Sequence, residues 1–120
     1  MTTAPDQLLD VSEDQGVTVV RLCPATILEA SLAQELGLQL YRFVEDLGVR
    51  KLVVDLAAVA YISADFLGKL IVLDQKMRRA DGKLVLVSLH PAIYECLTIT
   101  CLTKLFVICD TPQEGITLLT

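Results

Sequence analysis

The 120-residue sequence contains no tryptophan, a single histidine and fewer basic than acidic residues. Fifteen Asp and Glu residues against ten Lys and Arg residues give a net charge of −5 at pH 7. Domains that bind nucleic acid usually carry a basic stripe, whereas the Lys and Arg residues here are scattered along the chain. The composition therefore argues against nucleic acid as a partner.

Long apolar runs are also missing from the sequence. Asp55, Lys69 or Asp74 interrupts the longest of them well before the ~18 residues that a membrane span needs. The first residues, MTTAPDQLLDV, lack the basic segment and the long apolar segment of a secretory signal. We therefore expect a protein without membrane insertion and with a cytoplasmic location.

The four cysteines, at positions 23, 96, 101 and 109, include no Cys-x-x-Cys pair. With only one histidine in the chain, a zinc site would need unusual ligands. Three of the four cysteines lie among apolar residues, so we expect small buried thiols in a reducing compartment rather than a disulfide framework. We expect no metal site and no cofactor.

The sequence offers few parts for a catalytic site. No glycine-rich stretch of the kind that cradles nucleotide phosphates is present, and Ser63 lacks the flanking glycines of a nucleophile elbow. His90, just before Pro91, is either a base near a site or, more commonly, a loop or cap residue. Asp55 and Asp110 each follow an apolar run, either as paired carboxylates or magnesium ligands or, more simply, as acceptors for loop N–H groups. We expect a protein that is not an enzyme.

Hydrophobic residues make up 53% of the chain, which is enough for the core of a single domain spanning residues 1–120. The runs QLLDVS and GVTVVRL flank the polar turn EDQG, and this pattern predicts an antiparallel hairpin. Three later runs lack polar alternation, which is typical of strands covered on both faces. These runs are RKLVVDL, KLVLVSL and LFVIC.

Each later strand alternates with a helix signal. Apolar residues at helical spacing predict a helix over residues 28–47, with Gly37 inside it for no reason evident in the sequence. Both 26–29 and 31–34 fit a capping box, so the start of this helix is open by about one turn.

A second helix is predicted from the start at Ser63, with its apolar face at residues 66–77 and its end at Asp81-Gly82. Two more are predicted from Pro91 and from Thr111, where a cap, a proline and a capping box coincide. The order of elements is β-β-α-β-α-β-α-β-α. This order predicts an α/β fold with a central, mostly parallel sheet, an N-terminal antiparallel edge strand and about four helices.

Two stretches of the sequence resemble the STAS domain, the family of bacterial anti-sigma factor antagonists. LVVDLAAVAYISADFLGKL, residues 52–70, is similar to the family's apolar strand, short loop and Asp-Ser-Ser/Thr-Gly-Leu-Gly helix start. GKLVLVSLHPAIYECLTITCLTKLFVICDT, residues 82–111, is similar to its proline-containing run, its Leu-Thr-Gly-Leu turn and its Leu-Phe strand. The resemblance covers nearly the whole chain.

The resemblance implies a protein-binding switch. Family members of this kind bind an anti-sigma factor that has serine-kinase activity, and thereby free a sigma factor. The kinase phosphorylates a serine at the start of the second helix, and this releases the antagonist. A phosphate adds a charge of about −1.5 to −2, which breaks an interface by repulsion and desolvation.

This sequence departs from the family at the switch itself. The family's Asp falls on Ser63, its phosphoacceptor serine on Ala64, the next Ser or Thr on Asp65, and a Gly on Phe66. Because Ala64 has no hydroxyl, phosphorylation at that place is chemically impossible.

Three interpretations of the helix start remain open. Asp65 is a fixed charge in place of phosphate, Ser63 has become the acceptor, or the surface serves a constitutive partner. The hydroxyl of Ser63 is also well placed as an N-cap for the N–H of Asp65 or Phe66, which is the commoner use. Phe66 either packs against the sheet or is an aromatic anchor for a partner.

The expected function is a non-enzymatic interaction module that resembles an anti-sigma factor antagonist and acts as a monomer or weak dimer. Its expected partner surface consists of Glu29, Ser63, Ala64, Asp65, Phe66 and Lys69. The alternatives are a STAS subunit of a lipid-trafficking or other transporter complex and a sensor of small molecules or nucleotides. Cys101 falls where the family usually has Gly, so that turn is either strained or changed in shape.

Overall fold

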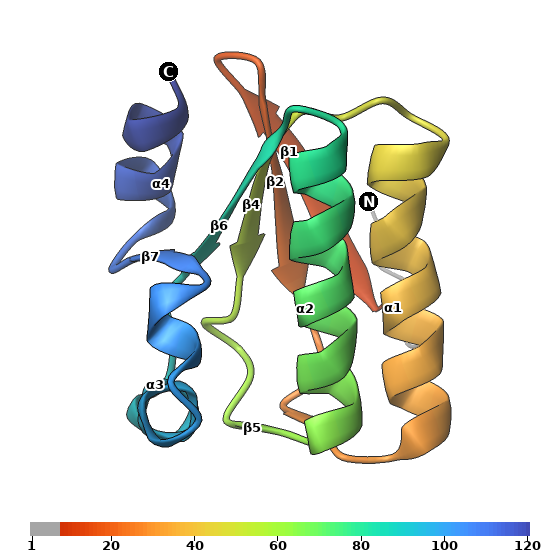
Figure 1. Cartoon of the computed structure of the whole chain (residues 1–120), viewed down its shortest axis with the longest axis vertical. Coiled ribbons are helices and arrows are strands. Elements are labelled where there is room, and N and C mark those ends of the chain that lie inside the picture. The colour runs from red at the N-terminus through yellow and green to blue at the C-terminus, as the bar shows by residue number, and fades with distance from the viewer. Residues whose placement is uncertain (1–7) are drawn as a thin grey trace.

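A five-stranded sheet forms the centre of the structure, a computed structural model that describes residues 8–120 (Figure 1). Its strands are β1 (Leu9–Asp14), β2 (Val17–Leu22), β4 (Lys51–Asp55), β6 (Lys83–Val87) and β7 (Val107–Cys109), in the order β1-β2-β4-β6-β7. β1 is antiparallel to β2, and every other pair is parallel. The predicted mostly parallel sheet with an N-terminal antiparallel edge is confirmed.

The hairpin between β1 and β2 turns over two residues. Gln15 and Gly16 have φ angles of 56° and 79°, and two consecutive positive φ angles are typical of the type I′ turn that suits a twisted hairpin. Glu13 and Asp14 extend β1 and pair with β2, so the predicted turn EDQG is two residues too long. Gln7, the first residue of the predicted strand, lies outside the described residues.

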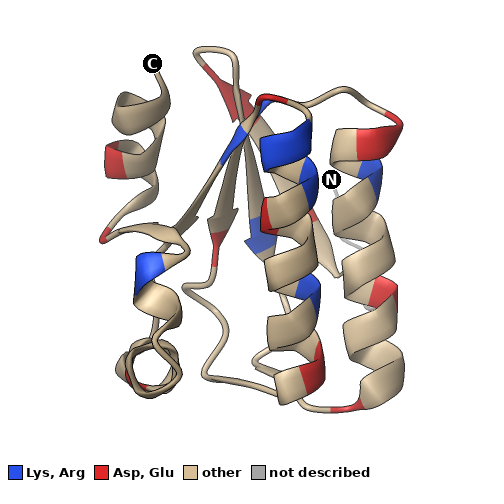
Figure 2. Ribbon diagram, in the orientation of Figure 1, with Lys and Arg blue, Asp and Glu red and all other residues tan. Residues whose placement is uncertain are grey.

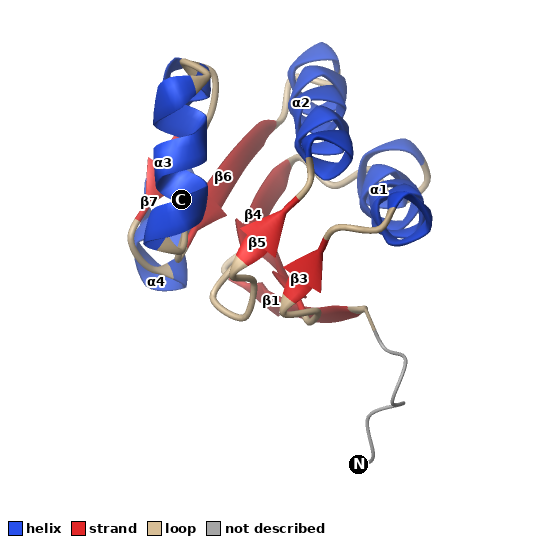
Figure 3. Cartoon of the chain, turned by 90° about the horizontal axis from the view of Figure 1, so that it is seen from below, coloured by secondary structure: helices blue, strands red, loops and turns tan. Residues whose placement is uncertain are grey.

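Four α-helices in residues 8–120 pack on the two faces of this sheet (Figure 3). They are α1 (Ala30–Glu45), α2 (Ala64–Arg79), α3 (Pro91–Ile99) and α4 (Pro112–Leu119), with a 3₁₀ turn, η1, at Leu102–Lys104. The larger apolar core lies between the sheet and helices α1, α2 and α3. A smaller core of valines lies under α4 on the opposite face. No helix in the described part of the chain is long and apolar enough to cross a membrane.

The start of α1 differs from both predicted capping boxes. Thr26 lies in a two-residue strand, β3 (Thr26–Ile27), which pairs in parallel with β5 (Tyr61–Ile62). The N-cap of α1 is Glu29, and its side chain makes no capping hydrogen bond. The pairing of β3 with β5 keeps residues 26–27 in a strand, so Thr26 lies three residues before the N-cap of the helix.

Gly37 allows α1 and α2 to pack closely. A Cβ atom at this position would lie 3.0 Å from Cγ and from Cδ of Lys69 on α2. The hydroxyl of Tyr41, one turn further along α1, donates a hydrogen bond to the backbone carbonyl of Lys69. The glycine that the sequence left unexplained therefore makes room for a lysine side chain between two helices.

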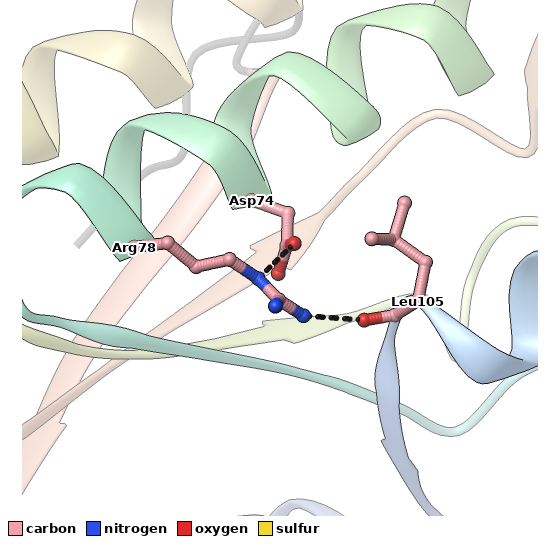
Figure 4. A network of polar contacts seen from close by, with 3 residues as sticks. All are labelled: Asp74, Arg78 and Leu105. Carbon is pink, nitrogen blue, oxygen red and sulfur yellow. Dashed lines mark hydrogen bonds and ion pairs between the residues drawn. The ribbon is translucent and has the colours of Figure 1, made fainter.

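The strand β7 is shorter than the predicted run LFVIC. Leu105 has helical backbone angles, and its carbonyl oxygen accepts a hydrogen bond of 2.8 Å from Nη2 of Arg78 (Figure 4). The Nε atom of the same arginine lies 2.7 Å from Oδ2 of Asp74, whose side chain is buried. This polar network ties the connection before β7 to helix α2 and keeps Leu105 out of the sheet.

The expectation of buried cysteines is wrong for the described chain. Cys96 and Cys101 are exposed, Cys23 and Cys109 are half-buried, and all four are free thiols. Cys96 lies on the solvent side of α3, because the apolar face of that helix consists of other residues. Burial raises the pKa of Cys109, and the negative charges of Glu114 and Asp110 raise it further. No cluster of three or more His, Cys, Asp or Glu residues suited to a metal occurs within residues 8–120.

Candidate interaction surface at the start of α2

The segment before α2 is held in place by backbone pairing. β3 and β5 form a parallel two-stranded sheet, and the N–H of Ala60 donates to the carbonyl of Ala25 at 2.8 Å. The N–H of Ser63 donates to the carbonyl of Ile27, also at 2.8 Å. These bonds place the loop that leads into α1 beside the turn that leads into α2.

Ser63 is the N-cap of α2, as the sequence predicts. Its backbone is extended, with φ −86° and ψ 165°, and its Oγ accepts a hydrogen bond of 3.2 Å from the N–H of Phe66. A side-chain oxygen in this position satisfies one of the N–H groups that have no partner inside the helix. The hydroxyl of Ser63 therefore has a structural use in the fold.

Ala64 and Asp65 follow in the first turn of α2, and both are exposed. A carboxylate in the first turn of a helix is favourable because it lies near the positive end of the helix dipole. Asp65 thus offers a fixed negative charge next to a methyl group that accepts no phosphate.

Phe66 is fully buried, with 0% of its surface exposed, and belongs to the larger core. Its packing on the sheet is confirmed, and the alternative of an exposed aromatic anchor is wrong. The helical turn that exposes Ala64 and Asp65 directs the next side chain toward the sheet. Lys69 is half-buried, because its aliphatic part lies against Gly37 of α1.

Glu29 is exposed directly before α1, two residues beyond the carbonyl of Ile27 that binds Ser63. The structure therefore brings the predicted Glu29 loop and the start of α2 to the same end of the molecule. Figure 2 shows acidic segments at the start of α2 and in the loop before α1, while the basic segments of α2 lie further along the helix.

Two exposed apolar side chains, neither of them predicted from the sequence, accompany these charges. Leu28 is 56% exposed and Tyr61 is 57% exposed, whereas their neighbours Ile27 and Ile62 point inward. Successive side chains of a strand point to opposite sides, so Tyr61 points away from the core that Ile62 faces. Leu28 follows the inward-facing Ile27 directly after β3. Strand alternation in the pair Tyr61-Ile62 is the signal that could have found Tyr61. We call these two exposed residues the Leu28–Tyr61 patch.

Two of the other candidate residues, Asp55 and His90, have structural roles. Oδ1 of Asp55 accepts a hydrogen bond of 2.9 Å from the N–H of Ala57, which confirms the simpler interpretation of this carboxylate. Asp110 follows β7, and β6 separates β7 from β4, so the backbones of Asp55 and Asp110 are two strand spacings, about 10 Å, apart. His90 is the N-cap of α3, and its Nδ1 accepts from the N–H of Ala92.

Comparison with known proteins identifies the family. The model of the STAS domain matches residues 9–115. The chain belongs to the STAS domain family. Its fold is that of solved STAS structures, and the family prediction made from residues 52–70 and 82–111 is confirmed.

Three solved structures illustrate the range of similar proteins. An anti-sigma factor antagonist from Mycobacterium paratuberculosis is 27% identical, with 98% of both chains covered and a TM-score of 0.81. An anti-sigma-factor antagonist domain protein from Planctomyces limnophilus is 21% identical, with 92% of this chain and 97% of that chain covered and a TM-score of 0.82. The murine anion transporter Slc26a9 is 14% identical and covers 90% of this chain, which matches 18% of the transporter at a TM-score of 0.73.

Proposed function

We propose that this STAS domain is a non-enzymatic antagonist that binds an anti-sigma factor constitutively, without release by phosphorylation. The observation that carries the proposal is the start of α2. There Ala64 has no hydroxyl, and the neighbouring Ser63 uses its hydroxyl as a helix cap. The similarity to the mycobacterial antagonist over 98% of both chains supports an anti-sigma factor as the partner.

The proposed binding surface has an apolar centre and an acidic rim. The Leu28–Tyr61 patch supplies the centre, and Glu29 and Asp65 supply exposed carboxylates beside it. Interfaces gain most of their affinity from a few buried aromatic or apolar anchors, and rim charges set specificity and association rate. The partner should therefore present an apolar recess with basic residues around it.

The partner that fits this proposal is an anti-sigma factor with a serine-kinase domain, and the proposed location is the cytoplasm. The domain acts as a monomer or weak dimer. Among residues 63–66, where the family has its phosphorylation motif, only Ser63 has a hydroxyl. Its carboxylate neighbour Asp65 carries less charge than a phosphate, so binding persists where a phosphorylated antagonist is released.

A tagged protein captured from its native cells tests the partner class. Mass spectrometry of the bound proteins should identify a kinase-like anti-sigma factor, and the variants Tyr61→Ala and Asp65→Lys should retain much less of it. Glu13→Lys, on the hairpin at the far end of the sheet, is the matched control and should bind like the wild type. Equal recovery with all variants would show that this surface is not the interface.

The second candidate function is a STAS subunit of a membrane transporter, since the fold also occurs in the murine transporter. The same capture decides between the two candidates. An ATPase or permease in place of an anti-sigma factor would favour the transporter.

A further inference from the structure

A pocket of about 530 Å³ lies between α3 and the end of β7. Leu89 and Ile108 line its apolar part, and Tyr94 adds an aromatic ring that is half exposed. The volume falls in the range of pockets that hold small ligands or single side chains. The pocket opens beyond the carboxyl ends of β6 and β7, which is where ligands usually bind in open α/β sheets.

The charged groups around this pocket are all negative. Glu95 and Asp110 line it, and no Lys, Arg or His side chain does. Neither carboxylate forms an ion pair with another residue of the described chain. Burial is the main cause of the raised pKa of Cys109, and the negative charges of Glu114 and Asp110 add to it.

An aromatic ring beside two carboxylates is a suitable environment for a positively charged nitrogen. The face of a tyrosine ring attracts a cation, and each carboxylate adds its own attraction. The apolar wall accommodates the methylene groups that precede the charge in a lysine or arginine side chain.

The pocket and the start of α2 lie at the same end of the sheet. α3 contacts β5, the short strand that carries Tyr61, and both elements face the viewer in Figure 3. A partner on the Leu28–Tyr61 patch can therefore also reach α3.

We propose that the pocket formed by Tyr94, Glu95 and Asp110 receives an arginine or lysine side chain of the protein partner. The identity of the occupant rests on the proposed function, because a protein partner must supply the side chain. The preference for a cation rests on the pocket alone. The two parts can therefore fail separately.

A titration that needs no partner tests the pocket directly. The probes are N-acetyl-arginine amide, its neutral isostere N-acetyl-citrulline amide and tetramethylammonium, followed by ¹H–¹⁵N NMR of the whole chain. The arginine probe should produce saturable shifts at residues 94, 95, 108 and 110, and the citrulline probe should not. Absent shifts, or equal shifts with both probes, would overturn the proposal. Tighter binding of tetramethylammonium would indicate a free organic cation and overturn the assignment to a partner side chain.

Variants of the pocket residues test whether the arginine probe binds at this place. Glu95→Gln and Asp110→Asn should each lower the affinity for the arginine probe about two- to fivefold. Glu13→Gln, on the hairpin far from this pocket, should leave it unchanged. The same two pocket variants should weaken binding of the captured partner by a similar factor. If the partner binds all variants equally while the arginine probe does not, the pocket is a cation site that the partner does not use.

Discussion

Cys101 adopts the left-handed conformation that glycine normally occupies at this turn. Its φ and ψ angles are 62° and 19°, and its side chain is exposed, so the turn keeps its shape at the expense of strain. A non-glycine residue in this region destabilises the folded state by about 1–2 kcal/mol. Glycine relieves this strain, but its greater freedom in the unfolded chain offsets part of the gain in stability.

Cys101→Gly should therefore raise the free energy of unfolding by about 1 kcal/mol. Denaturant melts of the two proteins measure the difference. Cys96→Ser, another exposed thiol but in regular helix, should not be stabilising. A neutral or destabilising Cys101→Gly would show that the turn carries no strain.

Cys109 shows how local charge affects a half-buried thiol. Burial raises its pKa first, and Glu114 and Asp110 raise it further. Since only the thiolate reacts, Glu114→Gln should lower this pKa and speed alkylation by iodoacetamide at a fixed mildly alkaline pH. Peptide mapping of alkylation against time gives the rate, with Glu13→Gln as the distant control. The same rate in both variants would rule out an effect of this charge.

Helices α1 and α2 pack closely at Gly37, and this contact can be tested by mutation. Alanine is better than glycine in a helix by about 1 kcal/mol, but its Cβ would lie 3.0 Å from two atoms of Lys69. Gly37→Ala should therefore gain less stability in the wild type than in a Lys69→Ala background. A double-mutant cycle measures this coupling, and strictly additive effects would show that the two side chains do not compete for space.

Helix α2 is also tied to the connection before β7. Arg78→Ala would leave the buried carboxylate of Asp74 without its ion pair and release the carbonyl of Leu105. We expect a loss of about 2 kcal/mol, which is below the usual range for buried pairs because Arg78 is largely exposed.

Denaturant melts should show this loss for Arg78→Ala and almost none for Arg79→Ala, the exposed neighbour on the same helix. Adding Asp74→Asn to Arg78→Ala should recover part of the loss, since a neutral amide is less costly to bury than an unpaired carboxylate. If Arg78→Ala is as stable as Arg79→Ala, the network contributes nothing to the fold.

The elements themselves could be predicted where their signals are long or chemically specific. Apolar runs without alternation identified β4 and β6, and the Thr111-Pro112 cap located α4. The two-residue strands β3 and β5 could not be predicted, because so short a pair has no periodicity and depends on contacts distant in the sequence. Helix α1 begins at Ala30, within the predicted range of one turn but at neither predicted capping box.

At the candidate site, too, local features could be predicted and features that depend on tertiary packing could not. Ser63 was correctly assigned as a cap, because capping depends on local sequence. The burial of Phe66 and the exposure of Leu28 and Tyr61 depend on how the helix start and the small sheet face the core. The sequence alone left the burial of Phe66 open and did not indicate the exposure of Leu28 and Tyr61.

At the scale of the whole molecule, the charge distribution favours a basic partner. The chain has a net charge of −5, and Glu29 and Asp65 are exposed at the end where α2 begins. Figure 2 marks acidic segments at this end. The proposed interface should therefore associate more slowly as the salt concentration rises, because salt screens exposed charges. The apolar Leu28–Tyr61 patch then provides affinity that salt does not screen.

The central claim is that this STAS domain binds without a phosphorylation switch. In the most direct measurement, the purified complex of this domain and the captured kinase-like anti-sigma factor is incubated with Mg²⁺ and ATP. Intact-mass spectrometry then detects phosphate, and gel filtration follows the complex. Ala64→Ser, which restores the hydroxyl, is the matched variant. The account predicts an unmodified, still bound wild type and a phosphorylated, released Ala64→Ser. Phosphate on Ser63 of the wild type, with release of the partner, would contradict it.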